Sequence, residues 1–179
     1  RKENSARWDL YSVGLDGKKM IRHSFGDFSF NDMNLSPDFK YFTTTFSNLQ
    51  TMPTVALVDI KGKLVREIGS AKGTEAGNYS LPRKEIMRVK SADSLFDLPV
   101  LITYPINFDP NKKYPVLVSI YGGPNAGTVY DTYRSSASEI WWAQEGLVQV
   151  VFDNRSSGHF GKLGMNYIYR QLGKYEIED

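Results

Sequence analysis

The stretch Tyr114-Pro-Val-Leu-Val-Ser-Ile-Tyr121-Gly122-Gly123-Pro124 decides the fold of this chain. Its segment 115–121 is nearly all apolar, which predicts a strand buried on both faces, as in a parallel sheet covered by helices. The strand runs into two glycines, which allow close approach of the backbone. Because open α/β sheets place ligand-binding groups at this carboxyl edge, we expect a binding loop here.

A helix and a second apolar strand follow. Ser136-Ala-Ser-Glu139 predicts a capping box, in which the Ser and Glu side chains each satisfy a free amide of the other, and Gly146 predicts the helix end. Segment 147–152 predicts another strand buried on both faces. Residues 115–152 therefore predict a right-handed βαβ unit. Acidic residues after Tyr175 predict the start of a final helix.

The loop after the second strand reads Asp153-Asn-Arg155-Ser-Ser-Gly158-His-Phe-Gly161. Because neighbouring parallel strands end at one edge, both loops should open on the same rim. His159 beside Ser156 and Ser157 is not expected to form a catalytic triad, since three neighbours on one loop rarely take the required directions. His23 is expected to be a solvated strand residue rather than a ligand.

The first part of the chain has a different pattern. Residues 10–23 and 54–68 predict two hairpins, with turns at Asp16-Gly17 and Lys61-Gly62, and Tyr41–Phe46 predicts a strand between them. The separation of Gly17 and Gly62 falls within the period of four-stranded β-propeller blades. An ordinary meander or sandwich remains open as an alternative.

The polar, glycine-rich segment 69–84 separates the two patterns and is expected to be a linker. The fold class expected is mixed, with antiparallel strands before the linker and part of an α/β sheet over 85–179. A doubly wound sheet that stopped after its fourth strand would expose apolar edges, so we expect the chain to be cut inside a domain.

The composition excludes several kinds of protein. The 22 Lys and Arg residues nearly balance 20 Asp and Glu residues and are scattered, which argues against a nucleic-acid partner. The absence of Cys excludes a disulfide framework and a thiolate nucleophile, and two distant His residues suggest no metal site. No apolar stretch is long enough to span a bilayer.

Several motifs in this order resemble the prolyl oligopeptidase family, particularly its dipeptidyl peptidase IV branch. They are Tyr121-Gly-Gly-Pro124, the Asp153-x-Arg155-x-Ser-Gly loop and Arg170–Asp179, together with the Leu35-Ser-Pro-Asp38 turn and Lys112–Pro115. The resemblance covers nearly the whole chain. It implies C-terminal β-propeller strands over 1–68, a linker over 69–84 and the N-terminal portion of an α/β-hydrolase domain over 85–179.

The resemblance also implies a function. Resemblance to the dipeptidyl peptidase IV branch implies a serine exopeptidase that releases N-terminal dipeptides through a Ser, Asp and His triad. Tyr121 matches the family tyrosine whose hydroxyl donates to the oxyanion, and the residues that match the supporting loops of the site are Gly122, Gly123, Asp153 and Arg155. The implied partners are a peptide substrate and a second subunit in a homodimer. No cofactor is implied, and a periplasmic or cell-surface location is favoured.

The sequence departs from the family pattern in two ways. The Gly-x-Ser-x-Gly elbow does not occur, so the nucleophile, acid and base are expected outside this chain, which alone should be inactive. Many members have Asp-Gly-Arg-Gly-Ser-Gly where this chain has Asp153-Asn-Arg-Ser-Ser-Gly158, which leaves the loop geometry open. A non-catalytic binding or scaffold protein, and an acylaminoacyl peptidase or esterase, remain alternative functions.

Overall fold

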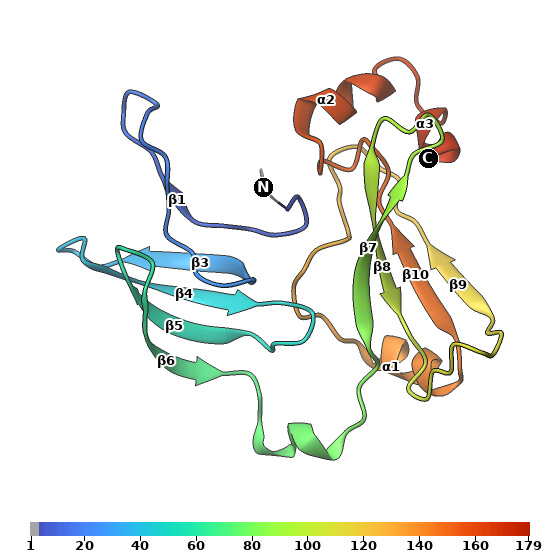
Figure 1. The fold of residues 1–179 in the computed structure, drawn as a ribbon, viewed down its shortest axis with the longest axis horizontal. Coiled ribbons are helices and arrows are strands. Elements are labelled where there is room, and N and C mark those ends of the chain that lie inside the picture. The colour runs from blue at the N-terminus through green and yellow to red at the C-terminus, as the bar shows by residue number, and fades with distance from the viewer. Residues whose placement is uncertain (1–3) are drawn as a thin grey trace. The chain divides into compact units, whose positions relative to one another are not determined.

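The computed structural model describes residues 4–179, which form two compact units (Figure 1). Unit 1 extends to Asn78 and includes Asp131–Arg134, and unit 2 comprises Tyr79–Tyr130 and Ser135–Asp179. The chain consists mostly of antiparallel strands with few helices. The strands are β1 (Tyr11–Ser12), β2 (Ile21–Arg22), β3 (Ser29–Leu35), β4 (Tyr41–Ser47), β5 (Thr54–Asp59), β6 (Leu64–Ser70), β7 (Lys84–Lys90), β8 (Asp97–Thr103), β9 (Val116–Ser119) and β10 (Val148–Phe152). The helices are α1 (Ala137–Gln144), α2 (Gly161–Met165) and α3 (Tyr175–Glu178), with short 3-10 turns η1 (Thr74–Asn78) and η2 (Asn166–Ile168).

Unit 1 contains an antiparallel sheet in the order β3-β4-β5-β6 and the separate hairpin β1-β2. Alternate residues of β4 face the core, where Phe42 and Phe46 are buried. Phe46 meets the rings of Phe25 and Phe28 edge-on, at 5.1 and 4.8 Å between centroids. These edge-to-face contacts add about 0.5–1.5 kcal/mol each to the burial of apolar area.

Both predicted hairpins of unit 1 are confirmed, with shorter strands at the first. Strand β3 was not predicted. Its sequence, Ser-Phe-Asn-Asp-Met-Asn-Leu, does not alternate regularly between apolar and polar residues. In the structure a register shift between Asn31 and Asn34 interrupts its pairing with β4. Asp32 in this bulge has a φ of 54°, a left-handed conformation that Asp tolerates better than most residues.

One turn motif closes a hairpin in each unit. In unit 1 the Ser36 hydroxyl donates to Asp38 (2.7 Å) and accepts the amide of Tyr41 (3.0 Å). In unit 2 the Ser91 hydroxyl donates to Asp93 (2.7 Å) and accepts the amide of Phe96 (3.0 Å). Each carboxylate also accepts a backbone amide two residues further on. The serine and aspartate therefore hold the turn between β3 and β4 and the turn between β7 and β8 by the same hydrogen bonds.

The sequence predicts that His23 is a solvated strand residue, and the structure shows that this prediction is wrong. It is 9% exposed, and its Nδ1 lies 2.5 Å from the carbonyl oxygen of Ile60. Because a carbonyl only accepts, Nδ1 carries the proton, and Nε2 lies 2.6 Å from the hydroxyl of Ser12. The sequence could not reveal this role, since Ile60 is in a different hairpin.

Gly62 is required at the turn between β5 and β6 for two reasons. Its φ is 84°, and a Cβ there would lie 2.7 Å from the carbonyl oxygen of His23. We expect Gly62→Ala to lower the free energy of unfolding of unit 1 by about 1–2 kcal/mol or more. Gly69→Ala is the matched control, because Gly69 has open space around it and no positive φ. Urea denaturation should separate the two variants, and equal losses would contradict this role of Gly62.

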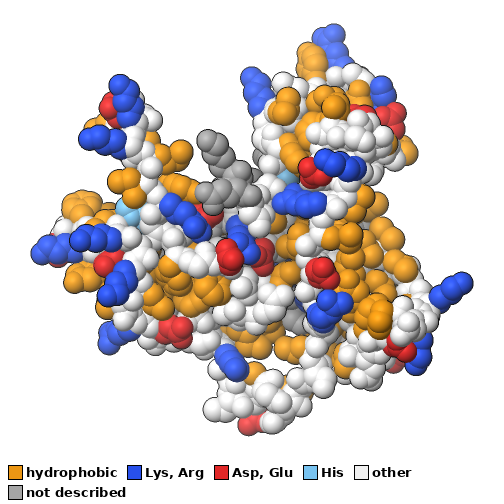
Figure 2. All heavy atoms as spheres, viewed as in Figure 1, with side chains coloured by type: hydrophobic (Ala, Val, Ile, Leu, Met, Phe, Trp, Pro, Cys, Tyr) orange, Lys and Arg blue, Asp and Glu red, His pale blue; other side chains and the backbone are white. Residues whose placement is uncertain are grey.

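The sheet of unit 2 has the order β7-β8-β10-β9 and is mixed rather than wholly parallel, which corrects the sequence-based expectation. Only β9 and β10 are parallel, and they are joined through α1 as the predicted βαβ unit. The expectation that β9 is buried on both faces is wrong, because all four of its residues are exposed. Among the described residues β9 has β10 as its one neighbouring strand, so its other edge is open. Hydrophobic side chains accordingly reach the surface over this sheet (Figure 2).

Helix α1 begins and ends as the sequence predicts, but its capping box is only half formed. The Ser136 hydroxyl accepts the amide of Glu139 (3.2 Å), and Gly146, with a φ of 82°, follows the last turn. The Glu139 carboxylate instead accepts from Lys84 (2.6 Å) and from the hydroxyl of Thr103 (2.8 Å). The ammonium group of Lys84, whose side chain is almost fully buried, competes more strongly for this carboxylate than a backbone amide does.

Candidate active-site rim

The structure brings together the two loops that follow the parallel strands β9 and β10. The side-chain amide of Asn154 donates to the carbonyl oxygen of Gly122 (3.1 Å). The backbone amide of Asn125 donates to the carbonyl oxygen of Ser156 (2.8 Å). Gly158 also lies against Asn125, since a Cβ on Gly158 would be 2.7 Å from the Asn125 side-chain oxygen. The two loops therefore form one rim at the carboxyl edge of the sheet.

Asp153 joins the same two loops through its carboxylate, which is buried. It accepts from the amides of Thr128 and Val129 (both 2.7 Å), from the Thr128 hydroxyl (2.8 Å) and from Nε2 of His159 (2.8 Å). Burial acts to raise the pKa of Asp153, but these hydrogen bonds, led by that of His159, outweigh it and hold the pKa below its usual value. Asp153 is thus an ionised anchor for residues 128–129.

Arg155 is 1% exposed and is held by two carboxylates. Its Nε and Nη2 both donate to Asp179, at 2.9 and 2.5 Å, and its Nη1 donates to Asp93 at 2.7 Å. The guanidinium carbon also lies 4.5–5.0 Å from the ring centroids of Phe96, Tyr167 and Tyr175. Hydrogen bonding to Asp179 raises the pKa of Arg155 further above its usual value, against the opposing effect of burial. Arg155 therefore fastens α3 and the β7–β8 turn to the loop after β10.

Tyr121 lies two residues after the end of β9 and is largely exposed, at 71%. Its ring rests over the backbone of Gly123, where a Cβ would lie only 2.5 Å from Cε1 of the ring. Gly122 between them has a φ of 71°, a conformation that favours glycine. The two glycines thus allow the chain to turn back beneath the tyrosine ring.

Both serine hydroxyls of the loop after β10 are bonded to Asn154. The Ser156 hydroxyl donates to the side chain of Asn154 (2.9 Å), and the Ser157 hydroxyl donates to the Asn154 carbonyl (2.8 Å). His159 faces Asp153 through Nε2. Neither serine hydroxyl therefore directs its proton to the imidazole, as a nucleophile of the Ser-His type would.

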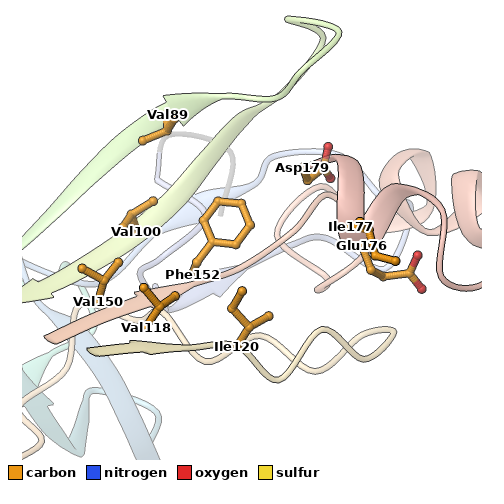
Figure 3. A pocket seen from close by; sticks show the side chains of 9 residues that line it. All are labelled: Val89, Val100, Val118, Ile120, Val150, Phe152, Glu176, Ile177 and Asp179. Atoms are coloured by element: carbon orange, nitrogen blue, oxygen red, sulfur yellow. The ribbon is translucent and has the colours of Figure 1, made fainter. Parts of the chain in front are cut away.

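An open hollow of about 390 Å³ lies on one face of the sheet of unit 2 (Figure 3). Its lining residues are Val89, Val100, Val118, Ile120, Val150, Phe152, Glu176, Ile177 and Asp179. Thr103 and Gln149 contact Glu139 of α1 and so point to the opposite face, because side chains alternate along a strand. The hollow is therefore an apolar sheet face that α1 does not cover.

Comparison with known proteins places this chain in a family. No family model matches the chain. A probable dipeptidyl-aminopeptidase B of Ajellomyces dermatitidis is 30% identical over 188 residues, covering 95% of this chain, and the bovine prolyl endopeptidase FAP is 34% identical over 57% of it. The crystal structure of dipeptidyl peptidase 4 from Porphyromonas gingivalis matches 97% of this chain with a TM-score of 0.82 and 29% identity. This chain belongs to the prolyl oligopeptidase family, in its dipeptidyl peptidase IV-like branch.

This member of the prolyl oligopeptidase family spans only part of the proteins it resembles. It covers 19% of the Ajellomyces protein, 13% of the bovine protein and 25% of the Porphyromonas chain.

Within residues 4–179, no helix is both long and apolar enough to cross a membrane. The described side chains also contain no group of three or more potential metal ligands.

Three residues of this rim were missed by sequence reasoning. Asp179 was read as a charge that favours the start of α3, yet its buried carboxylate holds Arg155. Asp93 was not singled out, although the Ser-x-Asp spacing it shares with Ser36-Pro-Asp38 could have identified its turn. Asn154 was noted only as a departure from the family pattern.

Asp93 makes the stability of this family member depend on pH in the acid range. Hydrogen bonds from the Ser91 hydroxyl and then from Arg155 lower the pKa of Asp93 to about 2. A lowered pKa means that Asp93 stabilises the fold above its ordinary pKa near 4 and that this contribution is lost as pH falls towards 2.

We therefore expect Asp93→Asn to reduce stability at pH 7, with a difference from wild type that shrinks as pH falls through about 2. Thermal unfolding of both proteins at a series of pH values measures this difference. Asp97→Asn, which removes an exposed pair with Lys90 on the same hairpin, is the matched control and should have a small effect at pH 7. A difference for Asp93→Asn that persists undiminished at pH 2 would contradict the assignment.

Proposed function

We propose that this chain is part of a serine exopeptidase that releases N-terminal dipeptides by acyl transfer to a serine. The observation that carries the proposal is the pair of hydrogen-bonded loops at the carboxyl ends of the parallel strands β9 and β10. Active sites of open α/β sheets form at this edge. The names of the relatives, which are dipeptidyl and prolyl peptidases, support the same chemistry.

Tyr121 is the residue we assign to catalysis. A phenol hydroxyl held at the sheet edge can donate to the negative oxygen of a tetrahedral intermediate, which stabilises the transition state more than the ground state. Gly122 and Gly123 let the loop turn beneath its ring. Asp153 accepts the amide of Val129 in the same loop, and Arg155 links the second rim loop to Asp93. The nucleophile, the general base and its acidic partner are assigned to residues outside these 179.

The domain organisation is part of the proposal. Residues 1–68 would supply the last strands of a β-propeller, 69–84 the linker, and 85–179 the first part of an α/β-hydrolase domain. The four-stranded antiparallel sheet β3–β6 supports the first assignment, and the βαβ unit from β9 to β10 supports the last. By resemblance we also propose that the full-length protein is a homodimer, which sedimentation would test.

The full-length protein should hydrolyse a Gly-Pro-anilide substrate and react with a fluorophosphonate probe, and the 179-residue chain should do neither. Labelling of the short chain would contradict the assignment of the nucleophile to another segment. A full-length protein inert to both reagents would favour a binding or scaffold role. Hydrolysis of acylated amino acids or esters in preference to free dipeptides would favour an acylaminoacyl peptidase or esterase.

A further inference from the structure

Asn154 occupies a position between the two loops that other kinds of side chain cannot fill equally well. It is 1% exposed, and its oxygen accepts the amide (3.1 Å) and the hydroxyl (2.9 Å) of Ser156. Its nitrogen donates to the carbonyl of Gly122 (3.1 Å). A backbone amide only donates and a carbonyl only accepts, so these partners fix which end of the side chain faces which loop. The site therefore requires a short side chain with one donor and one acceptor.

The carbonyl that Asn154 holds belongs to the peptide group that supports Tyr121. This group joins Gly122 to Gly123, and the tyrosine ring lies directly over the Gly123 backbone, as the 2.5 Å approach of a Cβ there indicates. Tyr121 is 71% exposed, so packing against other side chains restrains its ring little. The orientation of its ring thus depends on the peptide group beneath it.

We infer that Asn154 is a positioning residue for Tyr121, acting through the carbonyl of Gly122. This inference rests on the proposed function, in which the Tyr121 hydroxyl donates to the oxyanion. Asn154 touches no reacting atom. A loosened peptide group between Gly122 and Gly123 would let the ring leave the orientation in which its hydroxyl can donate, and small displacements of a catalytic donor reduce turnover strongly.

Asn154→Asp in the full-length protein tests the inference, because it replaces one donor by an acceptor without changing the size of the side chain. It keeps the bonds to Ser156 and loses the bond to Gly122. We expect kcat for Gly-Pro-anilide to fall about tenfold, the equivalent of one hydrogen bond, with KM within about twofold of wild type. Asn34→Asp removes a bond of the same kind, to the Asp32 carbonyl in unit 1, and should leave both constants unchanged.

A double-mutant cycle separates positioning from general destabilisation. If Asn154 acts through Tyr121, Asn154→Asp should change kcat less than about twofold in a Tyr121→Phe background, where no hydroxyl remains to be positioned. An equal tenfold loss in both backgrounds would overturn the inference. Asn154→Ala, which removes both ends of the link, should repeat the same pattern if the Asp variant folds poorly.

Hydrogen exchange of the peptide covering 120–127 gives a readout independent of activity. We expect faster exchange there in Asn154→Asp than in wild type, since the loop loses one of its links to the neighbouring loop. Unchanged exchange would overturn the inference whatever the kinetics. Absence of peptidase activity in the full-length protein would contradict the proposed function. The exchange measurement would still decide whether Asn154 holds this loop.

Discussion

Replacing Arg155 by methionine is expected to lower the free energy of unfolding of unit 2 by about 3–5 kcal/mol. The reason is the carboxylate left behind: the Asp179 side chain is fully buried and would lose three hydrogen bonds from the guanidinium group. Methionine fills much of the same volume between Phe96 and Tyr175, so the loss reports the charge and hydrogen bonds rather than a cavity. Urea denaturation, with exchange of unit 2 peptides to localise the change, measures the effect.

Arg83→Met is the matched control for this prediction. Arg83 also pairs with a carboxylate, Glu85, and lies 3.8 Å above the ring of Tyr104, but both charged side chains are half exposed or more. Water screens such a pair, so its loss should change stability by less than about 1 kcal/mol. Similar losses for the two variants would show that burial of the Arg155 cluster has no special effect on stability.

Arg155→Lys extends the same experiment. Lysine keeps the positive charge but cannot reach Asp179 with two donors while also reaching Asp93. We expect an intermediate loss of stability, between those of wild type and the methionine variant. A lysine variant as stable as wild type would mean that charge alone, without the planar fork of donors, is sufficient to hold α3.

Tyr121→Phe is expected to lower kcat of the full-length protein by about 10²–10³-fold and to leave KM nearly unchanged. The substitution removes one oxygen atom, and the ring can keep its place over Gly123. Since the hydroxyl would act on charge that develops only in the transition state, its loss should affect turnover more than substrate binding. Steady-state kinetics with a Gly-Pro-anilide substrate provide the measurement.

Tyr169→Phe is the control for the tyrosine substitution. Tyr169 is 70% exposed, almost the same as Tyr121, but it follows the short turn η2 and lies outside both rim loops. Its variant should have unaltered kcat and KM. A rise in KM with unchanged kcat for Tyr121→Phe would assign the hydroxyl to substrate binding and would contradict its role as an oxyanion donor.

Local features of this protein could be predicted from its sequence. The glycine turns at Gly17 and Gly62, the N-cap at Ser136 and the helix end at Gly146 all lie where the sequence indicated. The apolar runs also predicted β9 and β10 and their parallel pairing through α1. These features depend on backbone conformations and periodicities within a few residues, which the sequence records directly.

Other features were decided by partners that lie far away in the sequence. The sheet is mixed because β8, and not a second parallel strand, pairs with the other side of β10. The Glu139 carboxylate pairs with Lys84 rather than with the backbone amide at its own helix end. The His23 ring is hydrogen-bonded to the carbonyl of Ile60. In each case several partners were compatible with the local sequence, and long-range packing selected one of them.

In the candidate site, too, some features follow from the sequence and others only from the tertiary structure. The sequence determined which loops follow the two parallel strands, and its resemblance to the family singled out Tyr121 and Arg155. The tertiary structure decided what holds them: Asp93 and Asp179 around the guanidinium, and Asn154 beneath the tyrosine loop. Hydrogen bonds and ion pairs depend on distances of about 3 Å between atoms, and only the folded chain sets such distances between residues that are far apart in sequence.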